Sequence, residues 1–136
     1  MIKIQEKNFS IEKEVNNLKS KHKDIGALNV FIGYVRNMNL KKEVNSIYLE
    51  VYPLMAKKKL KEIIVKAKKR WKIKDYLIIH RYGKLKVAEK IVMVAIISKH
   101  RNESFLSCKY IMDYLKKEAP FWKKENYKKS SKWLIN

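Results

Sequence analysis

Ser98-Lys-His-Arg-Asn-Glu-Ser-Phe105, continued by Asp113-Tyr-Leu-Lys-Lys-Glu-Ala-Pro-Phe-Trp-Lys-Lys-Glu125, is the stretch that decides how this chain folds. A run of apolar residues ends there in a cationic pair. After the pair, apolar residues recur with the three- and four-residue spacing of one helical face, at Phe105, Cys108, Ile111, Met112 and Leu115. Pro120 then disfavours helical geometry at the residue before it. The pattern predicts a buried strand followed by a helix that ends near Glu118.

The two ends of this predicted helix carry different cations. His100 and Arg101 lie at its N-terminus, where free backbone N–H groups and the helix dipole favour an anion such as phosphate. Lys116 lies in its last turn. In a straight helix the 15 residue steps from Arg101 to Lys116 span roughly 22 Å at about 1.5 Å per residue. If both ends serve one small ligand, we expect a homodimer in which the pair of one chain faces Lys116 of the other.

Outside this helix, the apolar patterns predict a mixture of strands and helices without regular alternation, which is typical of an α+β domain. The segment at 90–98 is apolar on both faces and should be the central strand, joined to the preceding strand by a turn containing Gly83. Arg36 begins a polar loop, 36–39, at the end of a strand, a position that suits a binding residue. We expect strands at 1–5, 26–35, 46–52, 75–82, 90–98 and 132–135, and helices at 10–19 and 53–71.

Length and composition limit the class of protein. The chain of 136 residues suits a single domain, residues 1–136, and its three glycines are too few for a phosphate loop or a dinucleotide fingerprint. Its one cysteine, Cys108, is expected in the core, which suits a reducing cytoplasmic compartment. The apolar run at 91–97 is too short to span a membrane. His22, His80 and His100 are far apart in the sequence, so we expect no metal site. His80 lies on an expected strand, where a buried polar group is usually only hydrogen-bonded, so we expect it to be structural.

The formal net charge of +20 favours contact with polyanions. Lysines are scattered along the whole chain, however, as on a solvated surface with only non-specific affinity for nucleic acid. A basic module that binds single-stranded nucleic acid, with Tyr127 and Trp133 as stacking aromatics, is the alternative function. It would bind oligonucleotides with steep salt dependence and would not need Lys116. The chain has only four arginines, and Arg36 and Arg101 are candidate binding residues among them. The planar guanidinium group of arginine binds phosphate through two hydrogen bonds, which the ammonium group of lysine cannot reproduce.

Five segments between Gly26 and about Glu125 resemble, in order, the large, catalytic subunit of molybdopterin synthase. They are Gly26-Ala-Leu-Asn-Val-Phe-Ile-Gly-Tyr-Val-Arg-Asn37, Leu49-Glu-Val-Tyr-Pro-Leu-Met55, His80-Arg81 with Gly83, His100-Arg101, and Asp113-Tyr-Leu-Lys116 with Ala119-Pro-Phe-Trp-Lys123. The resemblance implies an α/β hammerhead fold with a mixed or antiparallel sheet and about three helices. It also implies a sulfurtransferase of molybdenum-cofactor biosynthesis that needs no cofactor of its own.

The activity that the resemblance implies is the conversion of cyclic pyranopterin monophosphate into molybdopterin by insertion of two sulfurs as a dithiolene. The sulfur would come from the thiocarboxylated C-terminal glycine of a small ubiquitin-like carrier subunit. Two large subunits would form a homodimer with a carrier at each end, a heterotetramer. A non-catalytic scaffold that only binds the carrier is a third hypothesis.

Carried over residue by residue, the resemblance assigns Arg36, His100 and Arg101 to the phosphate and pterin of the substrate, and Lys116 and Lys123 to the thiocarboxylate. Cations stabilise the oxyanion that forms at an acyl carbon, and a lysine among like charges can exchange a proton or act as a nucleophile. We therefore expect Lys116 to be the reacting or proton-transferring residue and Lys123 the electrostatic anchor.

Other positions border the implied site or depart from the family pattern. Lys124 and Glu125 continue the motif and are expected to border the pocket. Tyr34, also a candidate substrate-binding residue, stands where the family often has lysine. Lys84 and Ala88 stand where a glutamate and a glycine are common, which affects the shape of the turn after Gly83. The first 25 residues show no usable resemblance.

Overall fold

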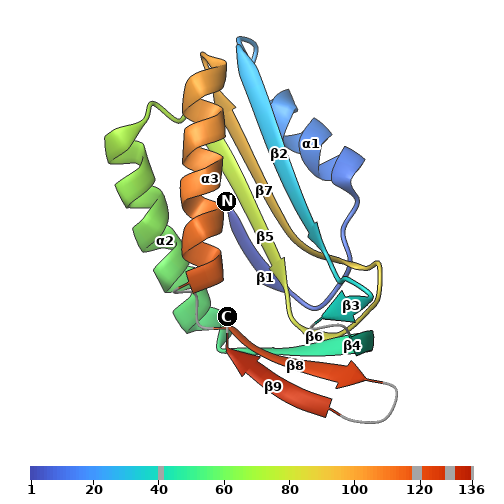
Figure 1. Cartoon of the computed structure of the whole chain (residues 1–136). Coiled ribbons are helices and arrows are strands. Elements are labelled where there is room, and N and C mark those ends of the chain that lie inside the picture. The colour runs from blue at the N-terminus through green and yellow to red at the C-terminus, as the bar shows by residue number, and fades with distance from the viewer. Residues whose placement is uncertain (40–41, 118–120, 128–130, 136) are drawn as a thin grey trace.

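The computed structural model describes residues 1–39, 42–117, 121–127 and 131–135, with side chains described for 1–37 and 46–117. The elements run in the order β1 (Ile2–Gln5), α1 (Ile11–Ser20), β2 (Ala27–Tyr34), β3 (Met38–Asn39), β4 (Lys42–Val51), α2 (Pro53–Arg70), β5 (Asp75–Arg81), β6 (Gly83–Lys86), β7 (Lys90–Ser98), α3 (Arg101–Lys117), β8 (Phe121–Tyr127) and β9 (Ser131–Ile135) (Figure 1). The described part thus contains three helices and mixed sheet, which confirms the predicted α+β class.

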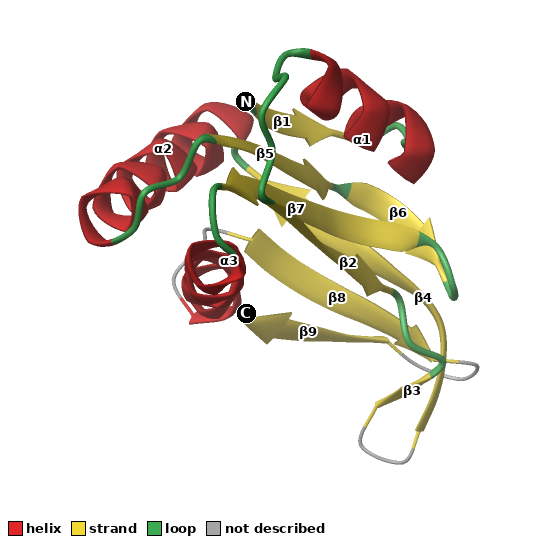
Figure 2. Cartoon of the chain, turned by 90° about the horizontal axis from the view of Figure 1, so that it is seen from above, coloured by secondary structure: helices red, strands yellow, loops and turns green. Residues whose placement is uncertain are grey.

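The larger unit is a sheet of order β1-β5-β7-β2 with helices on both faces. The strand β1 runs parallel to β5, and the other neighbours are antiparallel. Helices α2 and α3 cover one face and α1 covers the other (Figures 1 and 2). The strand β7 lies between β5 and β2, so its predicted central position is confirmed.

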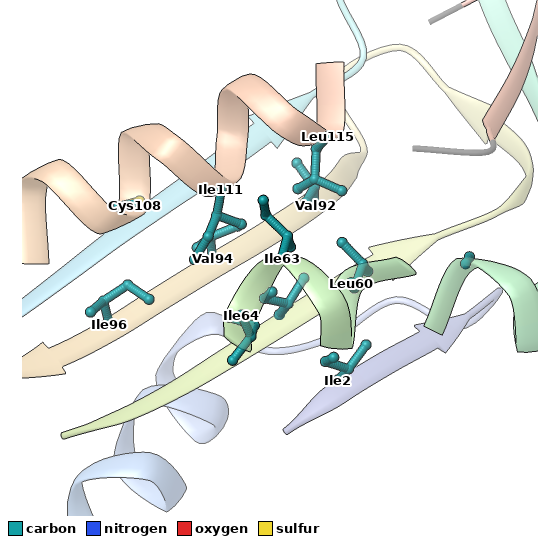
Figure 3. Packing of buried hydrophobic residues seen from close by; sticks show 12 residues of the cluster. Ile2, Leu60, Ile63, Ile64, Val92, Val94, Ile96, Cys108, Ile111 and Leu115 are labelled. Atoms are coloured by element: carbon teal, nitrogen blue, oxygen red, sulfur yellow. The ribbon is translucent and has the colours of Figure 1, made fainter. Parts of the chain in front are cut away.

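Alternate residues of β7 fill two separate cores, which explains why the strand is apolar on both faces. Toward α2 and α3, Val94 packs in one cluster with Ile63 and Ile111 (Figure 3). Toward α1, Met93 packs in a second cluster with Leu18. The Ser10 hydroxyl caps α1 by accepting a hydrogen bond from the Lys13 amide at 3.3 Å. Each helix therefore buries one apolar stripe against the sheet.

The smaller unit is built around β4, which pairs with β6 on one side and β8 on the other, while β9 pairs with β8 (Figure 2). Ile47 and Leu49 of β4 share a third apolar cluster with Leu85 of β6 and Val35. The strand runs directly into α2, where Pro53 occupies the first turn as expected. The small sheet therefore lies at the end of the main sheet where α2 begins and α3 ends (Figure 1).

Three sequence expectations were wrong here. Gly83 does not form the turn between β5 and β7; it opens strand β6 with a φ of 87°, and the turn follows β6. The loop expected at 36–39 contains strand β3, and the segment from Phe121 to Tyr127, for which no strand was expected, forms β8. In all three places the local sequence lacks a clear apolar–polar alternation of strand length, so pairing with β4 rather than local pattern decides the structure. No helix in the described part is both long and apolar enough to cross a membrane.

Candidate functional site

The N-terminal end of α3 presents the predicted cationic pair to solvent. Strand β7 ends at the buried Ser98, and α3 begins at Arg101, so the connection is only Lys99 and His100. His100 and Arg101 are both exposed. Because the first amides of a helix have no partner within it, this end offers N–H donors together with the His100 imidazole and the Arg101 guanidinium. The arrangement suits an anion, as the sequence predicts.

Two hollows open beside His100. One, of about 420 Å³, is lined by Arg70, Trp71, Lys72, Lys99, His100, Asn102 and Glu103. The other, of about 540 Å³, shares Lys72, Lys99 and His100 with it. The guanidinium carbon of Arg70 lies 4.8 Å from the ring centre of Tyr110 and 5.9 Å from that of Trp71, which holds this cation in place. The surroundings of His100 therefore carry more positive charge than Arg101 alone would supply, from Arg70, Lys72 and Lys99.

The sequence alone did not single out the charged residues at and just after the C-terminal end of α2 that line these hollows. Arg70 ends a run of lysines and Lys72 follows it, so both read as ordinary solvated charges. It also missed Glu103, one carboxylate oxygen of which is buried with no hydrogen-bond partner in the described part of the chain. Nothing in the spacing of Glu103 distinguishes it from a favourable acid in a first helical turn, so only the fold could reveal its surroundings.

The other end of α3 carries Lys116, which is exposed in the last turn. The backbone of β8 crosses the molecule at this end (Figure 1), with Lys123, Lys124 and Glu125 paired to residues of β4. Leu49 is the strand partner of Lys123. The side chains of these three β8 residues lie outside the described residues. The structure therefore places Lys116 and the Lys123 backbone toward the same end of the molecule, away from His100.

Tyr34 and Arg36 lie at the far end of β2 from His100. Ala27 pairs with Ser98 and Tyr34 with Lys90, so β2 spans about 24 Å at about 3.4 Å per residue between the two ends. Tyr34 is half exposed, and Arg36 is exposed. Within one chain the candidate residues thus form two groups, with His100 and Arg101 at one end and the others toward the opposite end.

The turn after β6 holds the end of β2. The Ala88 amide donates to the Val35 carbonyl at 2.9 Å, and the Val35 amide donates to the Glu89 carbonyl at 3.0 Å. Ala88 has a φ of 71°, a left-handed conformation that glycine adopts without strain. The departure from the family's glycine therefore retains the turn, and the turn fixes the residue that precedes Arg36.

The pair His80-Arg81 is structural. Burial lowers the pKa of His80 to about 4, and its Nδ1 lies 2.9 Å from the Arg81 carbonyl oxygen. Arg81 donates to the carbonyls of Glu6 at 3.1 Å and Lys90 at 2.8 Å. These contacts tie β5 to the chain on either side, in agreement with the structural role expected for His80.

Two further chemistries find no support among the described residues. Cys108 is buried, and burial raises the pKa of its thiol to about 11, so it stays protonated and is a poor nucleophile. No group of three His, Cys, Asp or Glu side chains in this part of the chain is arranged to hold a metal ion.

Comparison with known proteins gives one consistent result. A family model described as "MoaE protein" matches residues 4–118, so the resemblance extends into the first 25 residues, where none was apparent from the sequence. The chain is 45% identical over 133 residues to the molybdopterin synthase catalytic subunit of Ralstonia nicotianae, covering 98% of this chain and 76% of that protein.

Solved structures agree with this match. The structure of molybdopterin synthase from Staphylococcus aureus has a TM-score of 0.90 at 28% identity and covers 98% of this chain and 96% of that one. A complex of subunits 1 and 2 of the molybdopterin-converting factor from Helicobacter pylori shares the fold, with a TM-score of 0.81 at 18% identity and coverage of 99% and 90%. The chain therefore belongs to the MoaE family of molybdopterin synthase catalytic subunits, enzymes of molybdenum-cofactor biosynthesis.

Proposed function

We propose that this enzyme transfers sulfur from the thiocarboxylated C-terminus of a small carrier subunit to cyclic pyranopterin monophosphate, in an active site shared between two copies of the chain. The observation that carries the proposal is the separation of the cationic groups. His100 and Arg101 lie at the start of α3 and Lys116 at its end, too far apart for one small substrate. A site that uses both groups must take them from different chains.

One face of α3 suits the contact between the two copies. Phe105, Lys109, Met112 and Lys116 follow one another at four-, three- and four-residue intervals and so share a face of the helix. Phe105 is 60% exposed, and Phe31, on the neighbouring edge strand β2, is 42% exposed. If the α3 helices of two copies pack against each other through this face, related by a two-fold axis perpendicular to the helices, they run antiparallel. Arg101 of each copy then lies close to Lys116 of the other. The same symmetry gives two equivalent sites and supports a heterotetramer with one carrier at each end.

The cations have distinct tasks in this site. Arg36, His100 and Arg101 bind the phosphate and pterin, since guanidinium groups and helix N-termini both suit phosphate. The thiocarboxylate sulfur bonds to a substrate carbon as a carbon–oxygen bond of that carbon breaks and the oxygen leaves with the electron pair, so the carrier's acyl group becomes a thioester. Attack of water on the thioester then releases the carrier carboxylate and leaves a thiolate on the substrate. Lys116 stabilises the oxyanion of that hydrolysis and exchanges its proton, while Lys123 anchors the carrier terminus. Tyr34, Lys124 and Glu125 border the pocket.

Three observations support a separate carrier protein. The relatives are named catalytic subunits, which implies a second subunit. The Helicobacter structure of the same fold is a complex of subunits 1 and 2 of the molybdopterin-converting factor. Exposed apolar side chains at the start of α2, Leu54 at 86% and Met55 at 50%, lie toward the Lys116 end of the molecule and offer a contact for such a protein. A cytoplasmic location accords with the free thiol of Cys108.

Single-turnover conversion of cyclic pyranopterin monophosphate by this chain with its thiocarboxylated carrier tests the proposal. Product with a dithiolene, formed in step with loss of the carrier's thiocarboxylate, is the expected result. A folded chain that binds the carrier and releases no product would contradict the proposal and favour the scaffold hypothesis. Binding of single-stranded oligonucleotides that competes with the carrier and falls steeply with salt would favour the nucleic-acid module instead.

A further inference from the structure

His100 lies between two peptide groups that are each held by a separate contact. The first joins Lys99 to His100. A Cβ atom added to Gly26 would overlap the Lys99 carbonyl oxygen and lie 2.5 Å from its carbonyl carbon. The backbone of Gly26 is therefore packed directly against this peptide, and only a residue without a side chain allows the approach.

The second peptide joins His100 to Arg101. Ser98, which is fully buried at 0% exposure, donates a hydrogen bond from its hydroxyl to the His100 carbonyl oxygen at 2.5 Å. That oxygen belongs to the peptide group that carries the Arg101 amide. The Ser98 hydroxyl therefore fixes the peptide group that links the Cα atoms of His100 and Arg101, the atoms that carry the two side chains.

The first turn of α3 is tied to β2 as well. The Asn29 side-chain amide donates to the Ser104 carbonyl at 3.3 Å, and the Ser104 hydroxyl donates to the Arg101 carbonyl at 2.9 Å. Ser98, Asn29 and Gly26 thus hold the start of α3 from the last residue of β7 and the beginning of β2. Because Ser98 is fully buried, it cannot touch a ligand itself.

We propose that Ser98 and Gly26 are positioning residues that hold His100 and Arg101 ready for the substrate's phosphate. The proposal rests on the substrate-binding function proposed above for this pair. Exposed, flexible cationic side chains lose conformational freedom when they bind an anion, and a backbone that is already fixed reduces that loss. Loosening the backbone should therefore weaken anion binding while leaving the chemical step at Lys116 unchanged.

Kinetics of Ser98→Ala test the proposal, with Ser107→Ala as the matched control. Ser107 is equally buried on α3, and its hydroxyl donates to the Ser104 carbonyl at 3.4 Å, away from the His100 peptide groups. We expect Ser98→Ala to raise the KM for cyclic pyranopterin monophosphate about 5-fold to 10-fold, because the loss of one hydrogen bond corresponds to a factor of this size. The kcat should stay within about twofold of the parental value. Ser107→Ala should leave the KM unchanged.

A binding measurement separates this role from the proposed function. In protein with labelled histidine, the ring signals of His100 are followed by NMR as inorganic phosphate is added. Ser98→Ala should need a several-fold higher phosphate concentration for the same change than the parent chain does. If the parent gives no turnover but shows this difference, the positioning role stands and the proposed function fails.

The opposite results overturn the positioning role. The positioning role is contradicted if Ser98→Ala has the KM and the phosphate titration of the parent chain. It is also contradicted if Ser98→Ala lowers kcat and leaves KM unchanged. Should Ser98→Ala not fold, Ser98→Cys keeps the same side-chain shape, with a somewhat larger sulfur atom and a much weaker donor in place of the hydroxyl, and the same KM increase is expected of it. A Ser98→Cys chain that folds and binds phosphate like the parent would equally contradict the proposal.

Discussion

Arg101 and Lys116 lie at the two ends of one helix: Arg101 is the first residue of α3, and Lys116 is the last but one. They are 15 positions apart in the sequence, which corresponds to roughly 22 Å along a straight helix axis. The helix is packed along its length on β7 and β2, so the two groups cannot approach each other within a chain (Figure 1). A single site that needs both groups therefore requires two copies of the chain.

Lys116 should matter to the chemistry rather than to binding of the carrier. In Lys116→Ala we expect the single-turnover rate constant to fall about 100-fold to 1,000-fold, as when one oxyanion-stabilising group is lost. The carrier affinity should change little. Lys117→Ala, which removes the neighbouring exposed lysine of the same turn, is the control and should react like the parent. Equal losses in both variants would indicate a general effect of surface charge.

Phe105 should hold the dimer together. Its side chain is 60% exposed in the single chain, so Phe105→Glu should leave the fold intact but place a charge in the contact between copies. We expect the dimer Kd, measured by analytical ultracentrifugation, to rise at least about tenfold, with activity falling in parallel. Leu54→Glu, at an 86% exposed position on α2, should remain dimeric. A fully dimeric Phe105→Glu chain would place the interface elsewhere.

Ala88 is strained in its turn, so Ala88→Gly should stabilise the protein. A non-glycine residue at a φ of 71° costs about 1 to 2 kcal/mol, of which the greater freedom of glycine in the unfolded chain cancels a part. The free energy of unfolding, measured with urea, should rise by about 0.5 to 1 kcal/mol. Ala67→Gly, inside α2, should instead lower it by about 1 kcal/mol or more. A destabilised Ala88→Gly chain would contradict the conformation of this turn.

His80 should make stability depend on pH. Burial lowers its pKa from 6.5 to about 4, so the unfolded chain takes up a proton first as the pH falls. The contribution of the neutral, buried His80 to the free energy of unfolding is fully present above pH 6.5. It is lost as the pH falls toward 4, by up to about 3 kcal/mol. His80→Gln should remove this dependence in denaturation curves recorded between pH 7 and pH 4. If its stability follows pH as the parent's does, the loss comes from another group.

Asp75 acts in a different pH range. Burial raises the pKa of its carboxyl, but hydrogen bonds from His22 and from the Tyr76 amide outweigh burial, and the net pKa is below the ordinary 3.8. Its contribution to stability is therefore present above pH 3.8 and is lost only below that value. The two groups can be told apart by the pH at which stability falls.

Elements with a strong apolar period were predictable from the sequence. In α3 the stripe that contains Cys108, Ile111 and Leu115 predicted the helix, which begins at Arg101, with His100 directly before it, so the pair lies at the helix start as expected. Its predicted end at Glu118 lies outside the described residues. The strand β6 was missed because it buries Gly83 and Leu85 between exposed lysines, a pattern too short to separate from a turn. Only its pairing with β4 makes it a strand.

The candidate site was predictable in its parts but not in its arrangement. The position of His100 and Arg101 at a helix start follows from local pattern, and so does that of Lys116 at the helix end. The surroundings of His100 do not, because Arg70 and Lys72 reach it only through the packing of α2 beside α3. Likewise, the approach of Gly26 to Lys99 depends on the register between β2 and β7, which no local pattern fixes.

Mixed dimers test the shared active site most directly. A Lys116→Ala chain and a His100→Ala/Arg101→Ala chain are each expected to be inactive as homodimers, since every site lacks one group. In a fully exchanged equal mixture, half of the dimers contain one chain of each kind and have one complete site, so about a quarter of the parental activity should return. A mixture that stays as inactive as its components, although mixed dimers are shown to form, would contradict a site built from two copies of the chain.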